Sequence, residues 1–319
     1  MKKLVAAAFV GCLFAGALCA QEKVYLWPDK KGPGSEKVKA VQETIERSKI
    51  PNHLNRAVGG VTEPYFEIFK PAENVTSTKK SILVIPGGAY QRVVIDTEGY
   101  DYAKGYTDAG YTVFVLTYRT PNDGHKNKEL VALQDAQRAI RMIRANADSY
   151  GVAPFGVGVM GSSAGGHVAT SLMTRYKEET YKAVDSVDKD AKGEWVSARP
   201  AFQILVYPVI TMQDNGTHAG SRKALLGEKP SQKEKDAASC EKLVGGGESP
   251  AFIVCAQDDK SVNPYANAVA YWKALTDKGV KTELHIFPES GHGFGVLNAY
   301  GTAARWQQMS IDWMKTYLK

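Results

Sequence analysis

Short apolar runs alternate with segments of helical period along most of this chain, from Pro64 to the C-terminus. The runs expected as strands are residues 65–69, 81–85, 111–118, 156–160, 202–207, 251–256 and 282–287. The segments expected as helices are 99–109, 128–150, 168–173, 264–278 and 302–318. Strands that are apolar throughout and alternate with helices are typical of a parallel sheet covered on both faces. We therefore predict an α/β fold with a mostly parallel central sheet and helices on both faces.

Three polar stretches interrupt this alternation. Residues 21–64 contain several prolines and glycines and are expected to form an irregular lead-in that includes an early strand. Residues 176–199 and 209–250 are long insertions after elements of the sheet. Insertions of this kind tend to build the mouth of a site, although surface decoration fits them equally well. We expect a small cap from these insertions, and neither a repeat nor a linker divides residues 21–319, which are expected to form a single domain.

The first twenty residues have the pattern of a secretory signal peptide. Lys2 and Lys3 precede a short apolar core, and small residues at Cys19-Ala20 suit cleavage before Gln21. The core is shorter than a bilayer span requires, so we expect a secreted or periplasmic protein without a transmembrane segment in the mature chain. A lipid anchor is the alternative, because two cysteines lie in this region.

Charge and cysteine content narrow the expected partners. Loss of residues 1–20 lowers the formal charge from +6 to +4, with acids and bases interspersed, which gives no indication of nucleic-acid binding. Cys240 and Cys255 would remain in the mature chain, and Cys255 lies in an apolar run and is expected to be buried. The sequence leaves open whether these two cysteines pair, and it is silent on the oligomeric state.

The sequence Gly161-Ser-Ser163-Ala-Gly165 follows an apolar run and precedes a helix-compatible stretch. This Gly-x-Ser-x-Gly pattern is typical of a sharp strand-to-helix turn that exposes a serine hydroxyl, with Ser163 as the nucleophile. A serine needs a base, and the mature chain has six histidines. His292 suits this role because it lies in a glycine-flanked loop directly after the last predicted strand. His167 follows the nucleophile turn and is interpreted as a packing or hydrogen-bonding residue.

A carboxylate is needed to orient the imidazole. Asp258 and Asp259 both follow the strand expected at residues 251–256. We favour Asp259, because Val262 would then be the buried support of the turn, and Asp258 stays the alternative.

The remaining catalytic requirement is a set of N–H donors for the oxyanion. Residues 86–90 (Pro-Gly-Gly-Ala-Tyr) follow a strand, so the expected oxyanion hole is formed by Gly88 or Ala89 together with Ala164. The order Ser163, Asp259, His292 is the one found in α/β-hydrolase triads. No cofactor or metal is expected.

The chain resembles bacterial secreted α/β-hydrolases of the acetylxylan-esterase-like group, which are carbohydrate esterases. The segments that carry the resemblance are residues 26–28, 86–90, 116–119, 135–141, 161–167, 205–210, 258–262 and 291–294. Ala89 stands where the group usually has a third glycine, and Asn263 where a proline is common. Arg119, Asp135, Arg138 and Arg141 could contact substrate, but Asp135 and Arg138 are three apart on one helix face and are expected to form a structural ion pair.

These observations together predict a serine esterase. The resemblance implies hydrolysis of acetyl or other small acyl esters on plant-type polysaccharides or oligosaccharides, through an acyl-enzyme on Ser163. One alternative is a peptidase of the prolyl-oligopeptidase type, although the sequence offers no room for the large additional domain of those enzymes. The other is a non-catalytic binding protein on a hydrolase scaffold, although such proteins typically lack a triad member. The acyl group and the sugar are left open.

Overall fold

The computed structural model describes residues 23–51 and 53–318, and its centre is a mostly parallel sheet of eight strands in the order β1-β4-β7-β5-β8-β9-β10-β11. The strands from β7 to β11 are parallel, whereas β4 is antiparallel to both β1 and β7. The strands of this sheet are β1 (Lys23–Tyr25), β4 (Tyr65–Phe69), β5 (Ser81–Ile85), β7 (Thr112–Thr117), β8 (Val157–Ser162), β9 (Gln203–Val206), β10 (Ala251–Ala256) and β11 (Thr282–Phe287). The α/β-hydrolase architecture expected from the sequence is confirmed.

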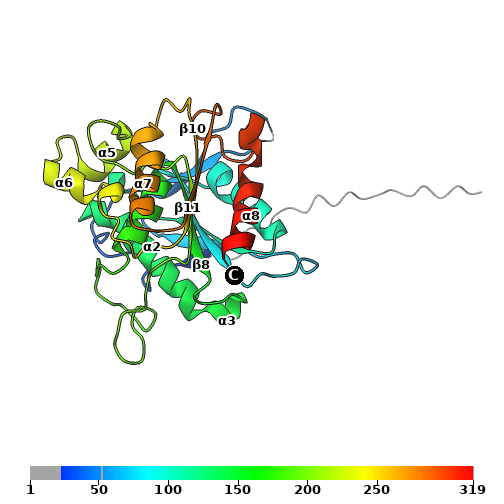
Figure 1. Cartoon of the computed structure of the whole chain (residues 1–319). Coiled ribbons are helices and arrows are strands. Elements are labelled where there is room, and N and C mark those ends of the chain that lie inside the picture. The colour runs from blue at the N-terminus through cyan, green and yellow to red at the C-terminus, as the bar shows by residue number, and fades with distance from the viewer. Residues whose placement is uncertain (1–22, 52, 319) are drawn as a thin grey trace, which may run out of the picture.

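Two apolar cores lie on opposite faces of the sheet, because successive residues of a strand point to opposite sides. In β5, for example, Leu83 belongs to one core and Ile82 to the other. Figure 1 shows the sheet nearly edge-on, with α2 and α7 on one side and α8 on the other. The helices are α1 (Asp101–Asp108), α2 (Lys128–Ala145), α3 (Ala147–Tyr150), α4 (Ser163–Arg175), α5 (Ala219–Leu226), α6 (Gln232–Ala237), α7 (Ala270–Asp277) and α8 (Trp306–Tyr317).

The predicted helices and strands from residue 65 onward are all present, with small differences at their ends. The helix expected at residues 128–150 is divided at Asn146 into α2 and α3, and Gly151 ends α3 in the left-handed conformation, with φ at 70°. The helices expected at 99–109 and 264–278 begin with π-helical turns, η1 (Asp96–Tyr100) and η4 (Tyr265–Val269). The apolar period therefore located these elements well.

The lead-in is more regular than its composition suggests. Besides β1, it forms β2 (Glu43–Glu46) and β3 (Arg56–Gly59), which pair as an antiparallel hairpin. The short strand β6 (Val93–Val94) adds to β3 and completes a second, three-stranded sheet. The expectation of an irregular segment was wrong here, because every residue of β2 is exposed and the strand has no buried apolar face to reveal it. The predicted signal peptide, residues 1–20, lies outside the described residues.

The two insertions lie in different places, and only residues 209–250 reach the cavity described below. Residues 209–250 follow the carboxyl end of β9, carry α5 and α6, and place His218 in the wall of the cavity described below. Residues 176–199 follow the end of α4 instead and lie along α2, where Arg138 binds Asp185 and Asp188. Because α4 starts at the carboxyl edge of the sheet and runs away from it, the segment that follows α4 lies away from that edge.

The expected ion pair between Asp135 and Arg138 does not form. Asp135 instead binds Arg119, with 2.8 Å between Nη2 and Oδ1, and also accepts the indole N–H of Trp27 at 2.8 Å. Arg138 donates to the carbonyl of Leu26 and to the carboxylates of the 176–199 insertion. Asp135 and Arg138 do lie three residues apart on one helix, but each side chain binds groups from the lead-in, from Arg119 or from the 176–199 insertion instead of the other. Their role is nevertheless structural, as expected.

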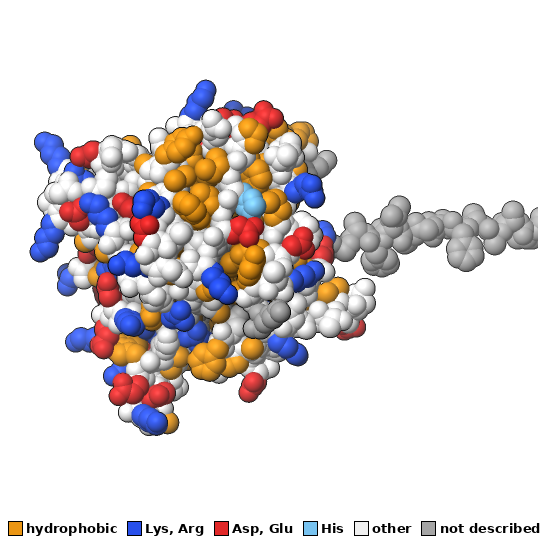
Figure 2. All heavy atoms as spheres, in the orientation of Figure 1, with side chains coloured by type: hydrophobic (Ala, Val, Ile, Leu, Met, Phe, Trp, Pro, Cys, Tyr) orange, Lys and Arg blue, Asp and Glu red, His pale blue; other side chains and the backbone are white. Residues whose placement is uncertain are grey.

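The predictions about the cysteines, the surface charge and membrane spans can also be compared with the structure. Within the described ranges, Cys240 and Cys255 are both free and buried, and burial raises the pKa of the Cys255 thiol to about 12. Acidic and basic side chains are interspersed over the face shown in Figure 2, in keeping with the mild net charge. None of the helices in the described part of the chain is long and apolar enough to cross a membrane.

Candidate active site

Ser163 lies at a sharp turn between the last residue of β8 and the first turn of α4. Its φ is 51°, in the left-handed region that non-glycine residues rarely adopt. Two glycines allow the close approach: a Cβ on Gly161 would lie 2.4 Å from the carbonyl oxygen of Gly165, and one on Gly165 would lie 2.0 Å from that of Ile85. Such backbone strain costs roughly 1–3 kcal/mol and is typical of functional sites. The turn holds the hydroxyl of Ser163 at the carboxyl edge of the sheet.

A chain of hydrogen bonds joins this serine to a histidine and a carboxylate. Ser163 Oγ is 2.8 Å from His292 Nε2, and His292 Nδ1 is 2.7 Å from Asp259 Oδ2. The carboxylate can only accept when ionised, so Nδ1–H of His292 donates to it and Nε2 is left to accept the proton of Ser163. Asp259 is almost fully buried, whereas His292 is partly open to solvent. This is the geometry of a nucleophile, its base and the group that orients the base.

The two candidate carboxylates are clearly separated by their contacts. The second oxygen of Asp259 accepts the N–H groups of Ser261 and Val262, and Val262 is buried as expected. Asp258 Oδ1 accepts the N–H groups of Ser290 and Gly291, in the loop that carries His292. Asp259 therefore contacts the imidazole, and Asp258 fixes the backbone of the histidine loop.

The segment expected to bind the oxyanion also lies at this site. Gly88 and Ala89 line the same cavity of about 330 Å³ as Ser163 and His292. Among the hydrogen bonds of the described residues, none is donated by the N–H of Gly88 or Ala89. The N–H of Ala164 belongs to the first turn of α4, where amides have no partner within the helix. Ala89 has φ at 57°, so its methyl group occupies a conformation that glycine adopts at lower cost.

Sequence reasoning missed Glu98, a buried carboxylate beneath the cavity. Its Oε2 accepts the N–H of Gly87 at 2.6 Å and the hydroxyl of Ser162 at 2.8 Å. Its Oε1 accepts the hydroxyl of Tyr207 at 3.2 Å, and the ring of Tyr207 packs against His292 with 4.9 Å between ring centroids. Glu98 thus connects the residue before Gly88, the residue before Ser163 and the ring beside the base. No motif marks it, because only the fold brings these three segments together.

The rim of the cavity is polar, and it comes partly from the lead-in. Arg47 and Asn55 reach it from the β2–β3 hairpin, Arg92 from the turn after Ala89, and His218 from the 209–250 insertion. Burial, and after it the charge of His292, lower the pKa of His218. Its Nδ1 accepts the N–H of Ser221 and so caps α5. The cavity therefore offers hydrogen-bonding groups and two cations around the hydroxyl of Ser163.

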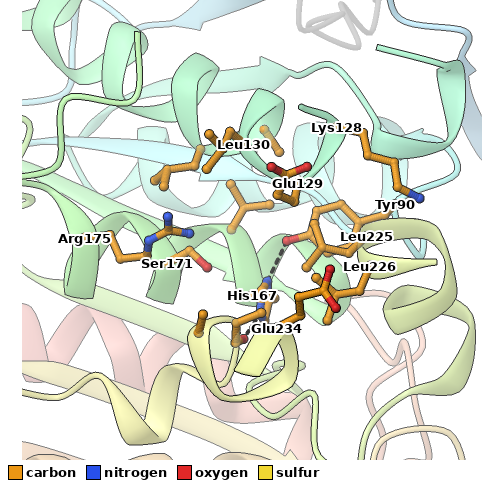
Figure 3. Close-up of a pocket in the computed structure, with 15 residues that line it drawn as sticks. Tyr90, Lys128, Glu129, Leu130, His167, Ser171, Arg175, Leu225, Leu226 and Glu234 are labelled. Carbon is orange, nitrogen blue, oxygen red and sulfur yellow. Dashed lines mark hydrogen bonds between the residues drawn. The ribbon is translucent and has the colours of Figure 1, made fainter. Parts of the chain in front are cut away.

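A second cavity of about 360 Å³ is lined by Tyr90, the last residue of the oxyanion segment (Figure 3). Tyr90 and His167 meet in its wall, with 2.7 Å between the tyrosine hydroxyl and His167 Nδ1. The other ring nitrogen, Nε2, donates to the carbonyl of Ala238. Neither Ser163 nor His292 lines this cavity. The interpretation of His167 as a hydrogen-bonding residue is confirmed, and it ties α4 to the segment that carries Ala89.

Comparison with known proteins places the chain among hydrolases. The family model described as BD-FAE matches residues 66–275, about two thirds of the chain, and its match ends before His292. The structure of an acetyl ester-xyloside bifunctional hydrolase from Caldicellulosiruptor lactoaceticus is similar, with a TM-score of 0.70 and 27% identity. That likeness covers 95% of this chain and 98% of the other, and therefore extends beyond the residues that the family model matches.

Two curated proteins are also similar in sequence. Endo-1,4-beta-xylanase B of Butyrivibrio fibrisolvens is 34% identical over 231 residues, which cover 72% of this chain and 35% of that protein. An acetylxylan esterase of Xylanibacter ruminicola is 28% identical over 250 residues, which cover 75% of this chain and 45% of that protein. The chain thus spans less than half the length of either relative.

Proposed function

Because the chain belongs to the BD-FAE family of α/β-hydrolase domains, we propose that it is a serine esterase acting on acetyl or other small acyl esters of plant-type polysaccharides or oligosaccharides. The observation that carries this proposal is the hydrogen-bonded chain from Ser163 through His292 to Asp259, at the base of a polar cavity. A hydroxyl, a base and a buried acid in this arrangement suit acyl transfer, and the partly open cavity admits an ester.

Acylation would begin with attack of Ser163 Oγ on the ester carbonyl while its proton moves to His292 Nε2. Asp259 keeps the imidazole in the correct tautomer and stabilises its protonated form. The negative charge that forms on the carbonyl oxygen would be bound by the N–H of Ala164 and of Gly88 or Ala89, each worth on the order of 3 kcal/mol. When the intermediate collapses, the bond to the leaving alcohol breaks and His292 returns the proton to that alcohol.

Deacylation reverses these roles with water as the nucleophile. His292 takes a proton from water, the resulting hydroxide adds to the acyl-enzyme, and Ser163 leaves with a proton returned by His292. The free carboxylic acid is the second product. Both half-reactions use the same donors, so one preorganised site serves two transition states.

The substrate class is proposed from the relatives and from the cavity together. The names of two relatives refer to acetyl esters, one acetylxylan and the other an acetyl ester-xyloside, and that of a third to a xylanase. The cavity rim in this chain carries amide, hydroxyl and imidazole groups, including Asn55, Thr97 and His218, which suit a sugar. We further propose that residues 1–20 direct export, as a polymeric substrate outside the cell would require.

A substrate panel tests the proposal. The wild-type protein is expected to release acetate from acetylated xylo-oligosaccharides and to hydrolyse 4-nitrophenyl acetate. Ser163→Ala should lower kcat/KM on both by at least about 10⁴-fold, because the nucleophile is lost while the fold is kept. Ser149→Ala, at an exposed site on α3, serves as the matched control. Feruloylated oligosaccharides and longer acyl chains in the same panel define the acyl group. Full activity in folded Ser163→Ala would refute the mechanism.

Asp258 and Asp259 provide an internal comparison. Asp259→Asn should lower kcat by on the order of 10⁴-fold, because the amide favours the wrong tautomer of His292. Asp258→Asn keeps an acceptor oxygen for the backbone of the histidine loop and removes only the charge, so it should cost less than about tenfold. Steady-state kinetics of the two variants, with circular dichroism to verify folding, separate these expectations. Equal losses in both would contradict the assignment of Asp259.

A further inference from the structure

Three charged side chains line the catalytic cavity: Arg47, Arg92 and Glu98. Glu98 is buried, and its two oxygens accept hydrogen bonds from three protein groups. The two arginines are exposed at the rim. Arg47 donates to the neutral side-chain amide of Asn55 at 3.3 Å, and Arg92 forms neither a hydrogen bond through its guanidinium nor an ion pair with any residue in the described part of the chain.

Most other arginines of this protein bind acidic or carbonyl oxygens. Arg56, on the same hairpin as Arg47, forms a bidentate ion pair with Asp96, with distances of 2.8 and 2.9 Å, and so fixes the hairpin over the sheet. Arg175 and Arg222 likewise pair with carboxylates. Arg141, Arg144 and Arg199 lack a carboxylate partner too, but they donate to backbone carbonyls. Arg47 and Arg92 are the arginines that line the catalytic cavity, and neither forms an ion pair with a carboxylate of the described residues.

The two guanidinium groups also affect one another. Both line the same cavity, and the positive charge of Arg92, after partial burial, lowers the pKa of Arg47. Arginine remains charged in proteins, so the repulsion cannot be relieved by loss of a proton. An anion between the two groups would relieve it and would gain charge-assisted hydrogen bonds.

The position of these arginines relates them to the reaction. Arg92 belongs to the turn that carries Gly88 and Ala89, since its N–H donates to the carbonyl of Gly88. Arg47 reaches the cavity from the second sheet. The rest of the lining includes the neutral polar side chains of Asn55, Thr97 and Asn298, which suit sugar hydroxyls. A cavity of about 330 Å³ is much larger than an acetyl group requires, so part of the alcohol portion of the ester must occupy it.

We propose that Arg47 and Arg92 bind a free carboxylate on the alcohol portion of the ester substrate, as in an acetylated oligosaccharide that carries a uronic acid. This inference rests on the proposed esterase function and names the substrate class within it. The planar fork of arginine matches a carboxylate, and two such groups from different segments would fix its position relative to Ser163. The charge of Glu98 acts on Arg47, but Glu98 is buried, forms no ion pair with either arginine, and has both oxygens engaged by protein donors, so the guanidinium N–H groups stay available to a substrate carboxylate.

A matched pair of substrates tests the inference. One is an acetylated xylo-oligosaccharide with a glucuronic acid branch, and the other is the same oligosaccharide with that carboxyl reduced to the alcohol. The wild-type kcat/KM is expected to be about 10- to 100-fold higher for the acid, as for a charge-assisted contact at a partly desolvated site. The ratio should fall when NaCl is raised from 0.05 to 0.5 M, because salt screens exposed charges.

Variants assign the preference to the two arginines. Arg47→Gln and Arg92→Gln should each reduce the ratio, and the double variant should bring it close to one. Because the ratio is taken within each variant, a general loss of activity cancels. Arg305→Gln, at an exposed site away from the cavity, is the matched control and should keep the wild-type ratio. A ratio near one in the wild type, or a ratio that survives in the double variant, would overturn the inference.

Two further experiments distinguish this inference from a carboxylate on the acyl side and from failure of the esterase function. The first compares kcat/KM for mono-4-nitrophenyl adipate and 4-nitrophenyl hexanoate, a pair in which the carboxylate lies on the acyl side of the ester. An arginine-dependent preference seen only in that pair would refute the placement on the alcohol. Hydrolysis of 4-nitrophenyl acetate by the wild type and by Ser163→Ala tests the esterase function by itself. An active, Ser163-dependent enzyme without the acid preference would disprove this inference alone.

Discussion

Arginine serves two different purposes in two regions of this molecule. At the flank of α2, Arg119 is fully buried and donates to the carboxylate of Asp135, the carbonyl of Pro33 and the hydroxyl of Ser35. At the catalytic cavity, Arg92 is exposed and no described residue binds its guanidinium. The first region is a closed network in which protein groups satisfy the charge, and the second is open toward a ligand.

The difference shows that the role of an arginine depends on its burial and its partners, and not on residue type alone. A buried charge costs several kcal/mol unless it is paired, so the closed network must be complete in the folded protein. An exposed charge can remain unpaired at little cost in free energy, and it stays available to bind a ligand. The ring of Trp27 lies near both Arg119 and Arg138, at 5.5 and 5.7 Å, which further fills the closed network. Stability should therefore depend on the first region, and selectivity on the second.

The largest expected effect comes from opening the closed network. Asp135→Asn leaves Arg119 buried without a counter-charge and should lower the free energy of unfolding by about 3–5 kcal/mol. Denaturant titration measures this loss. Asp214→Asn is the matched control, because Asp214 pairs with Arg222 and Lys235 but is mostly exposed, and its loss should lower the stability far less. Similar stability of the two variants would remove the distinction between the regions.

A smaller effect is expected at Glu98, a buried carboxylate within the open region. Glu98→Gln keeps the shape but replaces one acceptor oxygen with a donor, so the donors of Gly87, Ser162 and Tyr207 can no longer all be satisfied. The backbone before Gly88, the turn at Ser163 and the ring beside His292 should then shift relative to one another. This shift should lower kcat by about 10- to 100-fold with little change in KM. Glu129→Gln, at an exposed residue outside the catalytic cavity, is the control. An unchanged kcat would show that Glu98 does not position the site.

The smallest effect concerns the pH dependence of the closed network. Ser35 accepts from Arg119 and donates to His125, and burial, followed by the charge of Arg119, lowers the pKa of His125 to about 4. In the unfolded chain His125 therefore takes up a proton near pH 6.5, whereas in the folded chain it does so only near pH 4. The stabilising contribution is present above pH 6.5 and is lost progressively as the pH falls toward 4.

Urea unfolding of the wild type and of His125→Asn between pH 7.5 and 4.5 measures this contribution. The difference between the two free energies of unfolding should change in that interval, with the wild type losing more stability on acidification. Parallel curves for the two proteins would mean that the folded protein does not lower the pKa of His125.

Much of the fold was predictable because its elements are local. Runs such as residues 82–85 are apolar and buried throughout, so the sequence alone identifies them as part of a central strand. Strand β2 was not predictable, because all of its residues are exposed and it is defined only by pairing with β3. The partners of Asp135 were missed for a related reason, since they come from 108 and 16 residues away in the chain.

The candidate site divides in the same way. Ser163, His292 and Asp259 follow the ends of strands, and parallel strands bring their carboxyl ends to one edge, so their proximity followed from order and type. Glu98, Arg47 and Arg92 have no such signature. Their places depend on a π-helical turn, a hairpin of the lead-in and a left-handed loop, which only the three-dimensional structure brings together.

Covalent labelling with a fluorophosphonate probe, followed by peptide mapping, tests the central claim most directly. The probe reacts with a serine only where a base activates it and an oxyanion site accepts the phosphoryl oxygen. The account predicts stoichiometric labelling on Ser163, none in Ser163→Ala, and much slower labelling in Asp259→Asn. Folded wild-type protein that stays unlabelled, or that carries the label on Ser162, would contradict it.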